Sequence, residues 1–489
     1  MSQRRPPRPS ATRREIFRAM ALAVPAAALA AGCKGDQSSE DTGSMPTGSG
    51  LTTVPRNPLP SAPWEGSASV DPTRFPLGAQ TGEPRPDSLV FWAYAPGEST
   101  VDLHVARWDG SAWVDDGVRS ATASPEGYVH LEPTDLEPDT TYAVQAVTAD
   151  GAGSTVAHGR TAPAPDAAVE VVFGGTSCLD QGHGEYPSLD QVQELGPLDA
   201  MLWLGDTVYA DSRSTEEGYR SLWQEQLSKA TFQGILASTA GVWSWDDHEV
   251  DNNWNPQTIL PSRLDMAVKT FFETVSLPES VRSTRKLWRS LRFGKTVELF
   301  VLDVRSERNR GAGEYVSPEQ LAWLQQGLTD SECVWKVVAT SVPITQWPLA
   351  WSIQDAHRDR WDGFEGTQRQ ELLDHIVDNE LRGVLFVGGD LHQTTLSYVD
   401  PAGETGENLL EFLVGPGGSF LNVAARLLDD DQFPYGDGDW SAGRMSFLPD
   451  GTARLQTVHE SGEMMMEAVI DIDGNVTLEL ENHPWENDD

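Results

Sequence analysis

The chain has 489 residues, which is enough for two or three domains with a sizeable core. Its formal net charge of −39 argues against a nucleic-acid partner, because phosphate backbones must be met by Lys and Arg. The charge indicates a solvated acidic surface instead, and three cysteines are too few for a disulfide framework.

The first 33 residues are predicted to be an export signal that is not part of the fold. Arg13 and Arg14 lie in a twin-arginine pattern, and the apolar stretch 19–31 is too short to span a bilayer. Small residues then precede Cys33, as in a bacterial lipobox. We therefore expect export by the twin-arginine route and a lipid on Cys33 that anchors a periplasmic or cell-surface lipoprotein. A plain signal with a chance cysteine is the alternative.

Residues 34–66 are rich in Gly, Ser, Thr and Pro, which predicts a flexible tether. Residues 67–163 predict a small all-β sandwich, because short alternating runs such as 88–94 and 101–106 are separated by turn signals. Tyr142 follows one of these turns and resembles the tyrosine corner of immunoglobulin and fibronectin type III sandwiches. We see no chemistry in this region and expect it to serve packing and spacing.

Residues 168–489 form the next predicted domain, after a hinge at 161–166. Strand-like and helix-like runs alternate here, and the segment after about 440 is again β-like. The expected strands are 169–173, 202–204, 242–245, 297–303, 335–340 and 384–388, and the expected helices are 187–195, 317–328 and 368–377. This alternation predicts an α/β layered core.

Four of the predicted strands end abruptly in residues that bind metals. These residues are Cys178; Asp206 with Tyr209; Asp246, Asp247, His248 and Glu249; and Asp390 with His392. Strands that are buried on both faces place their carboxyl ends around one crevice. The sequence therefore predicts that carboxylates, imidazoles, a thiol and a phenol gather there as a metal site.

Two of these residues suit a shared site. Asp206 can bridge two cations, and Tyr209 can supply a phenolate that a trivalent ion such as Fe³⁺ stabilises. A helix cap at Asp206 and a core tyrosine at Tyr209 are the alternatives. Thiolate, phenolate and imidazole suit a transition metal, whereas carboxylates suit Ca²⁺, Mg²⁺ or Mn²⁺. Cys178 at the crevice mouth is therefore read as a ligand rather than an inert thiol, although a Cys178–Cys333 disulfide is left open.

The ionisable run 246–249 would repel itself unless cations or partners neutralise it. Asp247 is the expected ligand, and His248 can give a proton to a leaving oxygen. Asp390 and His392 are separated by one residue, so in an extended stretch their side chains fall on one side and can serve adjacent metals. The other eight histidines are expected to be ordinary surface or core residues.

In this order, the motifs resemble PhoD-type alkaline phosphatases, which belong to the calcineurin-like metallophosphatases. The matching motifs are Ser177-Cys178, Gly205-Asp206 with Tyr209, Trp245-Asp246-Asp247-His248-Glu249 with Asn252-Asn253, Leu302-Asp303 with Arg305, Trp361-Asp362-Gly363, and Gly389-Asp390 with His392. Residues 75–92 resemble that family's N-terminal β domain. The resemblance implies a metallophosphatase-like β-sandwich core flanked by helices, and secreted hydrolysis of phosphate monoesters or diesters.

The resemblance also implies where each metal is held. Fe³⁺ would be surrounded by Cys178, Asp206, Tyr209 and His392. The second metal, Ca²⁺ or alternatively Mn²⁺, Mg²⁺ or Zn²⁺, would be held by Asp247 and Asp390. The chain departs from the family's motifs at Val304 and at 341–343, and one ligand of the second metal is unassigned. The candidates for it or for a supporting role are Asn252, Asp246, Asp362 and His357.

We therefore predict an exported metal-dependent hydrolase of small phosphoester substrates. His248 would assist the leaving group, and Arg305 would hold a non-bridging phosphoryl oxygen. A phosphodiesterase or phospholipase D-like activity of the same site is the alternative. A third hypothesis is a non-catalytic lipoprotein that binds surface glycan or protein through its sandwich, and it predicts no bound metal.

Overall fold

The computed structural model describes residues 51, 53–348, 358–428 and 430–483. The predicted export signal with Cys33, most of the predicted tether, and His357 lie outside the described residues. Among the residues that the structure describes, no helix combines the length and the apolar character needed to span a membrane.

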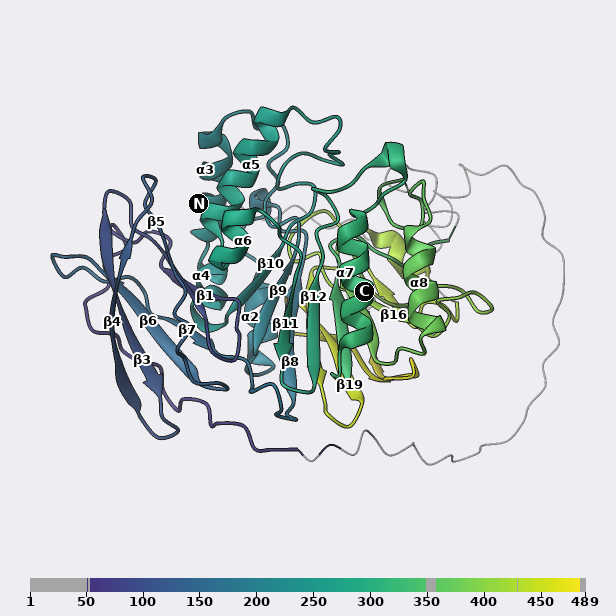
Figure 1. Cartoon of the computed structure of the whole chain (residues 1–489), viewed down its shortest axis with the longest axis horizontal. Helices are drawn as coiled ribbons and strands as arrows, with labels where there is room; N and C mark the ends of the chain where they lie inside the picture. Colours follow the sequence, from purple (N-terminus) through teal and green to yellow (C-terminus); the bar gives the residue numbers. More distant parts are fainter. Residues whose placement is uncertain (1–50, 52, 349–357, 429, 484–489) are drawn as a thin grey trace. The chain divides into compact units, whose positions relative to one another are not determined.

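Among the described residues, two large sheets and a smaller one make up the β-structure (Figure 1). The ten-stranded sheet has the spatial order β21 (Val476–Glu481), β20 (Met464–Asp471), β19 (Thr452–His459), β18 (Ser441–Phe447), β8 (Val171–Thr176), β9 (Ala200–Leu204), β10 (Gly241–Ser244), β1 (Ala79–Gly82), β2 (Val90–Tyr94) and β5 (Tyr128–Leu131). The seven-stranded sheet has the order β11 (Arg289–Phe293), β12 (Val297–Val301), β13 (Trp335–Ala339), β14 (Val384–Gly388), β16 (Leu410–Leu413), β15 (Thr394–Tyr398) and β17 (Tyr435–Asp437). The third sheet is β4 (Trp113–Thr122), β3 (Thr100–Trp108), β6 (Thr141–Val147) and β7 (Ala157–Arg160).

Helices cover the outer faces of the two large sheets. The ten-stranded sheet is covered by α2 (Pro187–Glu194), α3 (Glu216–Leu227), α4 (Ala230–Ser238), α5 (Pro261–Thr274) and α6 (Glu279–Thr284), and the seven-stranded sheet by α7 (Pro318–Asp330) and α8 (Gln368–Asp378). Short 3₁₀ turns are η1 (Gln181–His183), η2 (Arg310–Ala312) and η5 (Val423–Leu427). The predicted alternation of strands and helices, and so the layered core, is confirmed.

Side-chain alternation along the strands explains the layers. In β9, Leu202 and Leu204 face the core between the sheets, and Trp203 faces the helices. The ring of Trp203 stacks on that of Trp243 with centroids 4.8 Å apart. Between the sheets, residues from both inner faces form one buried cluster, and the central strands of each large sheet are buried on both sides.

The N-terminal strands form the predicted sandwich, because β1, β2 and β5 share a buried core with the four-stranded sheet, but this sandwich is continuous with the rest of the fold. β1 pairs in parallel with β10 at Gly82 and Gly241, so β1, β2 and β5 continue the ten-stranded sheet. The predicted tyrosine corner is present, because the Glu137 backbone N–H donates to the Tyr142 hydroxyl over 2.8 Å. The all-β region is therefore braced against the strand that leads to residues 246–249.

Part of the expected tether is ordered. The Val54 N–H donates to the Ala168 carbonyl, and Arg56 pairs with Asp139 at 2.6 Å and Asp199 at 2.7 Å. The Gly- and Pro-rich composition predicted a flexible chain up to residue 66. The ion pairs of Arg56 hold the chain to the folded domain ten residues before that point. The prediction of flexibility up to residue 66 was therefore wrong.

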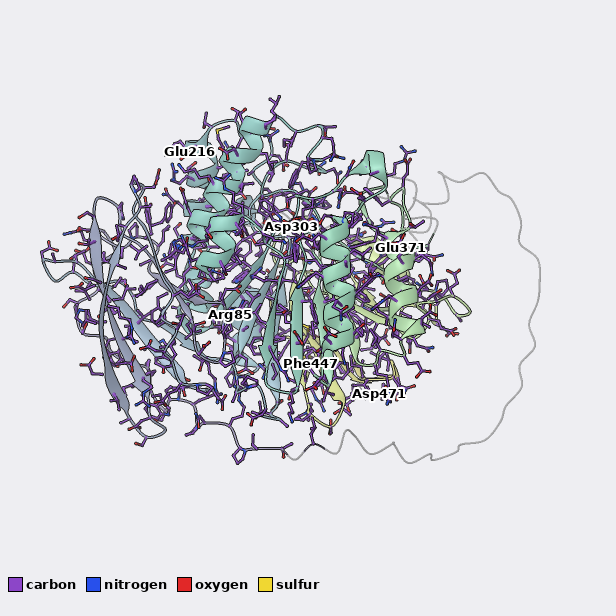
Figure 2. The ribbon with its side chains drawn as sticks, viewed as in Figure 1. Arg85, Glu216, Asp303, Glu371, Phe447 and Asp471 are labelled. Atoms are coloured by element: carbon purple, nitrogen blue, oxygen red, sulfur yellow. The ribbon has the colours of Figure 1, made fainter. Side chains whose placement is uncertain are left out.

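The strands that lead to the motif residues share a direction. β8, β9 and β10 are mutually parallel neighbours, and β12, β13 and β14 are parallel neighbours in the other sheet. Figure 2 labels Asp303, which follows β12 at the carboxyl edge, and Phe447, which pairs with Val171 at the opposite edge. The carboxyl edge is where the predicted ligands meet.

Candidate metal centre

The predicted ligand residues leave their strands in an unusual backbone conformation. Cys178, Asp206, Asp390 and His392 have φ values of 58°, 55°, 66° and 56°. Left-handed conformations of non-glycine residues cost about 1–3 kcal/mol each and cluster at functional sites. Gly205 allows the strand ends to approach, because a Cβ there would lie 2.6 Å from that of Asp246. The chain thus carries local strain where it aims these side chains inward.

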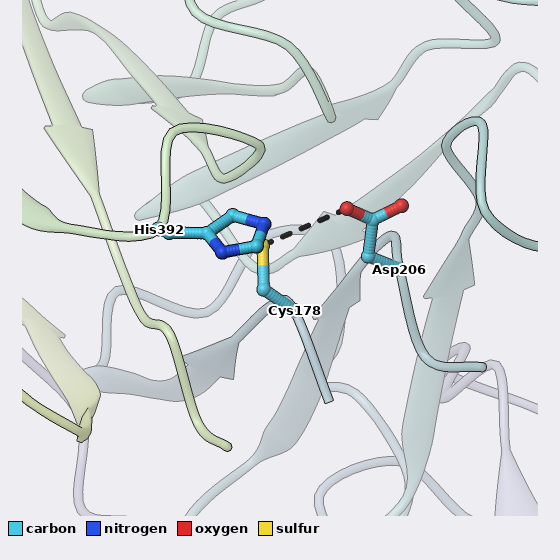
Figure 3. Close-up of side chains that lie close together, drawn as sticks. All are labelled: Cys178, Asp206 and His392. Carbon is cyan, nitrogen blue, oxygen red and sulfur yellow. Dashed lines mark hydrogen bonds between the residues drawn. The ribbon is translucent and has the colours of Figure 1, made fainter. Parts of the chain in front are cut away.

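One set of side chains, which we call the thiol group, comprises Cys178, Asp206, Tyr209 and His392. Ligand atoms of Cys178, Asp206 and His392 lie within 4.8 Å of one another, and all three residues are buried. Figure 3 shows the three side chains converging, with the Cys178 Sγ 3.7 Å from Asp206 Oδ2. The Tyr209 hydroxyl lies 3.2 Å from His392 Nε2, so the phenol joins the same set.

A second set, the carboxylate group, comprises Asp246, Asp247 and Asp390. Their oxygens also lie within 4.8 Å of one another. The two groups adjoin, because Asp206 forms a further set within 4.8 Å with Asp247 and His248. The structure thus places all six predicted metal ligands, together with Asp246, in two neighbouring groups linked by Asp206.

The electrostatics of the carboxylates fit bound cations. Burial, followed by the charges of Asp247 and Cys178, raises the pKa of Asp206 well above its ordinary value. Burial and the charges of Asp246 and Asp247 do the same to the pKa of Asp390. Asp246 Oδ2 and Asp247 Oδ1 are buried without a hydrogen-bond partner. A cation would neutralise the repulsion between these carboxylates and would give the two unpaired oxygens a partner. The residues therefore fit a metal site.

The thiol group fits a metal of a different kind. His392 Nδ1 donates to the Phe420 carbonyl over 2.9 Å, which leaves the lone pair of Nε2 facing the group. Burial lowers the pKa of His392 to about 4, so the ring is neutral as a ligand must be. Burial raises the pKa of the Cys178 thiol to about 12, and such a thiol loses its proton when it coordinates a transition metal. Cys178 and Cys333 are both free thiols, so the disulfide left open by the sequence does not form.

His248 lies beside the centre with its ring fixed on two sides. Its Nδ1 is 2.7 Å from Asp211 Oδ2, and its ring stacks on Tyr209 with centroids 4.1 Å apart. Burial alone would lower the pKa of His248, but the bond to Asp211 and the charge of Asp247 raise it to about 9. The ring is therefore an imidazolium at neutral pH, with Nε2 left to donate.

Arg305 does not have the role expected from the sequence. Its side chain is fully buried, and it pairs with Asp246 at 2.5 Å, Asp247 at 3.7 Å and Asp359 at 2.6 Å. A guanidinium enclosed by three carboxylates has no face for a phosphoryl oxygen. The predicted phosphate contact was therefore wrong, because the run after β12 turns Arg305 beneath the carboxylate group. There it holds the pKa of Asp247 below its ordinary value, against the effect of burial.

The remaining candidates for the unassigned ligand lie apart from the two groups. Asn252 has an exposed side chain, and its backbone N–H donates to Asp211 over 2.6 Å, which is a loop-capping role. Asp362 accepts from the Trp347 N–H and from Arg360, and none of the three ligand sets includes it. Asn252 and Asp362 are therefore supporting residues, and Asp246 is the candidate that joins the carboxylates.

Sequence reasoning missed several residues that hold the site together. Asp211 binds His248, and Glu249 accepts the backbone N–H groups of Asp206, Thr207 and Asp246. The Gln181 side chain donates to the Tyr209 carbonyl and accepts from its N–H. Glu249 could have been found, since an acidic residue directly after a ligand run needs partners. Nothing in the sequence around Gln181 marks its contact.

The chain is similar to known proteins in its N-terminal all-β region and in the α/β domain that follows. A family model described as PhoD-like phosphatase matches residues 171–427, and the model of the N-terminal domain of PhoD-like phosphatases matches residues 60–163. Alkaline phosphatase D of Bacillus subtilis (strain 168) is 26% identical over 384 residues, which cover 66% of this chain and 65% of that protein. The match thus spans slightly less than two thirds of the length of this relative.

Two solved structures have the same fold. One described as the structure of PhoD gives a TM-score of 0.73 at 22% identity, and covers 86% of this chain and 94% of its own. A purple acid phosphatase from yellow lupin (Lupinus luteus) seeds gives a TM-score of 0.59 at 15% identity, and covers 80% of this chain and 74% of its own. These likenesses confirm the predicted fold class.

Proposed function

Because the chain belongs to the PhoD-like phosphatase family, as its motifs predicted, we propose that it is an exported metal-dependent phosphoester hydrolase. The observation that carries this proposal is the pair of adjoining ligand groups linked by Asp206, with two buried carboxylate oxygens that lack a partner. A lipoprotein that only binds surface glycan would have no reason to bury so many uncompensated acids.

The ligand types divide the metals between the two groups. The thiol, phenol and imidazole suit Fe³⁺, and the carboxylates suit Ca²⁺, with Mn²⁺, Mg²⁺ or Zn²⁺ as alternatives. Two cations at such a site clamp phosphoryl oxygens and lower the pKa of an attacking water. Asp206 would serve both ions, and Arg305 would hold Asp246 and Asp247 in place from below.

His248 would deliver a proton to the leaving oxygen from Nε2. Asp211 keeps the Nδ1 proton and the ring orientation, and Tyr209 limits rotation of the ring. The proton is needed most when the leaving alcohol is a poor leaving group. The site would therefore combine a proton donor with a set of cation ligands.

Export and anchoring are also proposed on the strength of the leader. The twin-arginine route carries folded proteins, so the metals would be loaded before export. Lipid on Cys33 would then hold the enzyme at the membrane, in the periplasm or at the cell surface, where it would meet small phosphoesters.

The decisive experiment starts from the exported protein purified from the membrane fraction. Elemental analysis should find iron and calcium, and hydrolysis of nitrophenyl phosphate should stop when a chelator is added. Mass spectrometry of the N-terminal peptide should show lipid on Cys33. A metal-free, inactive protein would favour the binding lipoprotein instead. Faster turnover of bis(nitrophenyl) phosphate or of a phospholipid would favour the diesterase and phospholipase D-like alternatives respectively.

A further inference from the structure

Phe420 exposes an aromatic ring beside the thiol group. Its exposed fraction is 73%, and in the part of the chain that the structure describes it is the one aromatic residue among the exposed large hydrophobics. Its ring lies against that of His392, with centroids 3.8 Å apart. A single exposed apolar residue is ordinary on a protein surface, so its position against a ligand residue is what requires an explanation.

The loop that carries Phe420 is tightly held. The Phe420 carbonyl accepts from His392 Nδ1 over 2.9 Å, and the Trp440 indole donates to the Ser419 carbonyl over 2.6 Å. Beyond Phe420, the Asn422 N–H donates to the His392 carbonyl over 3.0 Å. The ring is therefore presented by fixed backbone on both sides, and its exposure does not come from a loop with few contacts.

His392 connects Phe420 to the thiol group. The Nε2 edge of the imidazole faces the Tyr209 hydroxyl and the Cys178–Asp206 pair, and the Phe420 ring covers the same imidazole. Because Cys178, Asp206 and His392 are buried, a phosphoryl group held by them would direct its organic part toward the protein surface. The Phe420 ring is exposed and lies against His392, so it is an apolar surface available to this part.

We propose that Phe420 is a specificity-determining residue that forms an apolar subsite for phosphate esters with an aromatic organic group. This inference rests on the proposed phosphoester hydrolase function and names its substrate class. Ligand sites pair a few polar groups with aromatic walls, and ring–ring contacts add affinity beyond the area that they bury. The competing explanation is that the ring only shields His392 from water.

Phe420→Ala separates these explanations, because the variant keeps the backbone carbonyl that accepts from His392. The substrates are benzyl phosphate and ethyl phosphate, which release primary alcohols with and without a ring. We expect kcat/KM for benzyl phosphate to fall about tenfold, as expected for the loss of roughly 1.4 kcal/mol of aromatic contact, and that for ethyl phosphate to stay within about twofold. Val423→Ala, which removes another exposed apolar side chain nearby, should change neither value.

Two outcomes would overturn the inference. Equal losses on both esters, together with a fall in metal content, would show that the ring shields His392. Unchanged values for both esters would show that the ring has no role. Calorimetric binding of benzylphosphonate and ethylphosphonate to wild type and Phe420→Ala tests the subsite without turnover. If the wild type hydrolyses neither of these esters and neither nitrophenyl phosphate nor bis(nitrophenyl) phosphate, the proposed function fails, and the phosphonate preference still decides the role of Phe420.

Discussion

The thiol group and the carboxylate group adjoin, but different forces hold them in place. At His392 and Tyr209 of the thiol group the supporting contacts are neutral: the Phe420 carbonyl fixes His392, and the Gln181 amide holds the backbone of Tyr209. Beneath the carboxylate group the support is ionic, because Arg305 pairs with both Asp246 and Asp247. Neutral contacts thus orient the imidazole and the phenol, whereas the charge of Arg305 keeps the pKa of Asp247 below its ordinary value inside the protein.

This difference supports the proposal that one crevice holds two unlike ions. A thiolate and an imidazole select a transition metal by ligand type, while oxygen ligands around a hard cation tolerate variation in geometry. Arg305 offsets part of the carboxylate charge when no cation is bound. Substitutions that affect one group without the other are therefore the best tests of the division.

Asp206→Asn should have the largest effect, because Asp206 belongs to the thiol group and also lies next to Asp247. We expect both metals to be lost and the hydrolysis of nitrophenyl phosphate to fall by more than about 10³-fold. Elemental analysis and the rate are measured on the same preparation.

Asp303→Asn is the matched control for this substitution. Asp303 follows β12 as Asp206 follows β9, but it accepts from the Trp245 indole and belongs to no ligand set. This variant should keep both metals. Full retention of either metal in Asp206→Asn would show that the two groups do not share this residue.

Cys178→Ser should affect the thiol group selectively. Outer partners of a metal site are worth about 10–100-fold in affinity, so loss of a ligand should weaken iron binding by about 100-fold or more. Calcium content should be unchanged, because Cys178 shares no ligand set with Asp246, Asp247 or Asp390. Cys333→Ser, at the other buried free thiol, is the control and should keep both ions. Parallel loss of calcium in Cys178→Ser would contradict the division.

Much of this arrangement could be predicted from the sequence because it follows from local patterns. An apolar run followed by Asp206 or Asp390 indicates both a buried strand and a polar carboxyl edge. The Ser317 cap of α7 is equally local, since its side chain accepts from the Gln320 N–H three residues later. Such features depend on the spacing of neighbouring residues, so they can be predicted directly from the sequence.

The errors share a cause, which is contact between distant segments. The motif around Arg305 predicted a phosphate ligand, but Arg305 pairs with Asp359, which lies 54 positions further along the chain. Arg56 lies in a stretch with the composition of a linker, yet Asp139 and Asp199 hold it. Composition and spacing say nothing about which charge a folded chain will bring to a given side chain.

The same limit concealed the link between the N-terminal region and the carboxylate group. Glu83 is buried at the end of β1 and accepts from Arg289 Nε over 2.9 Å, and Arg289 Nη2 also donates to the Trp243 carbonyl in β10 over 3.1 Å. β10 leads directly to Asp246 and Asp247. The all-β region thus supports one ligand group and has no such contact with the other among the bonds described.

Glu83→Gln should therefore have the smallest and most selective effect on the site. Leaving the buried Arg289 without its counter-charge should lower the free energy of unfolding by about 3 kcal/mol in urea. Calcium affinity should weaken by roughly 0.5–1 kcal/mol, because β10 positions the carboxylate group, while iron content stays constant. Glu98→Gln, which breaks the part-exposed Arg74–Glu98 pair, should change neither metal. If calorimetric calcium titration finds no change in Glu83→Gln despite the lost stability, the N-terminal strands support the fold but not the site.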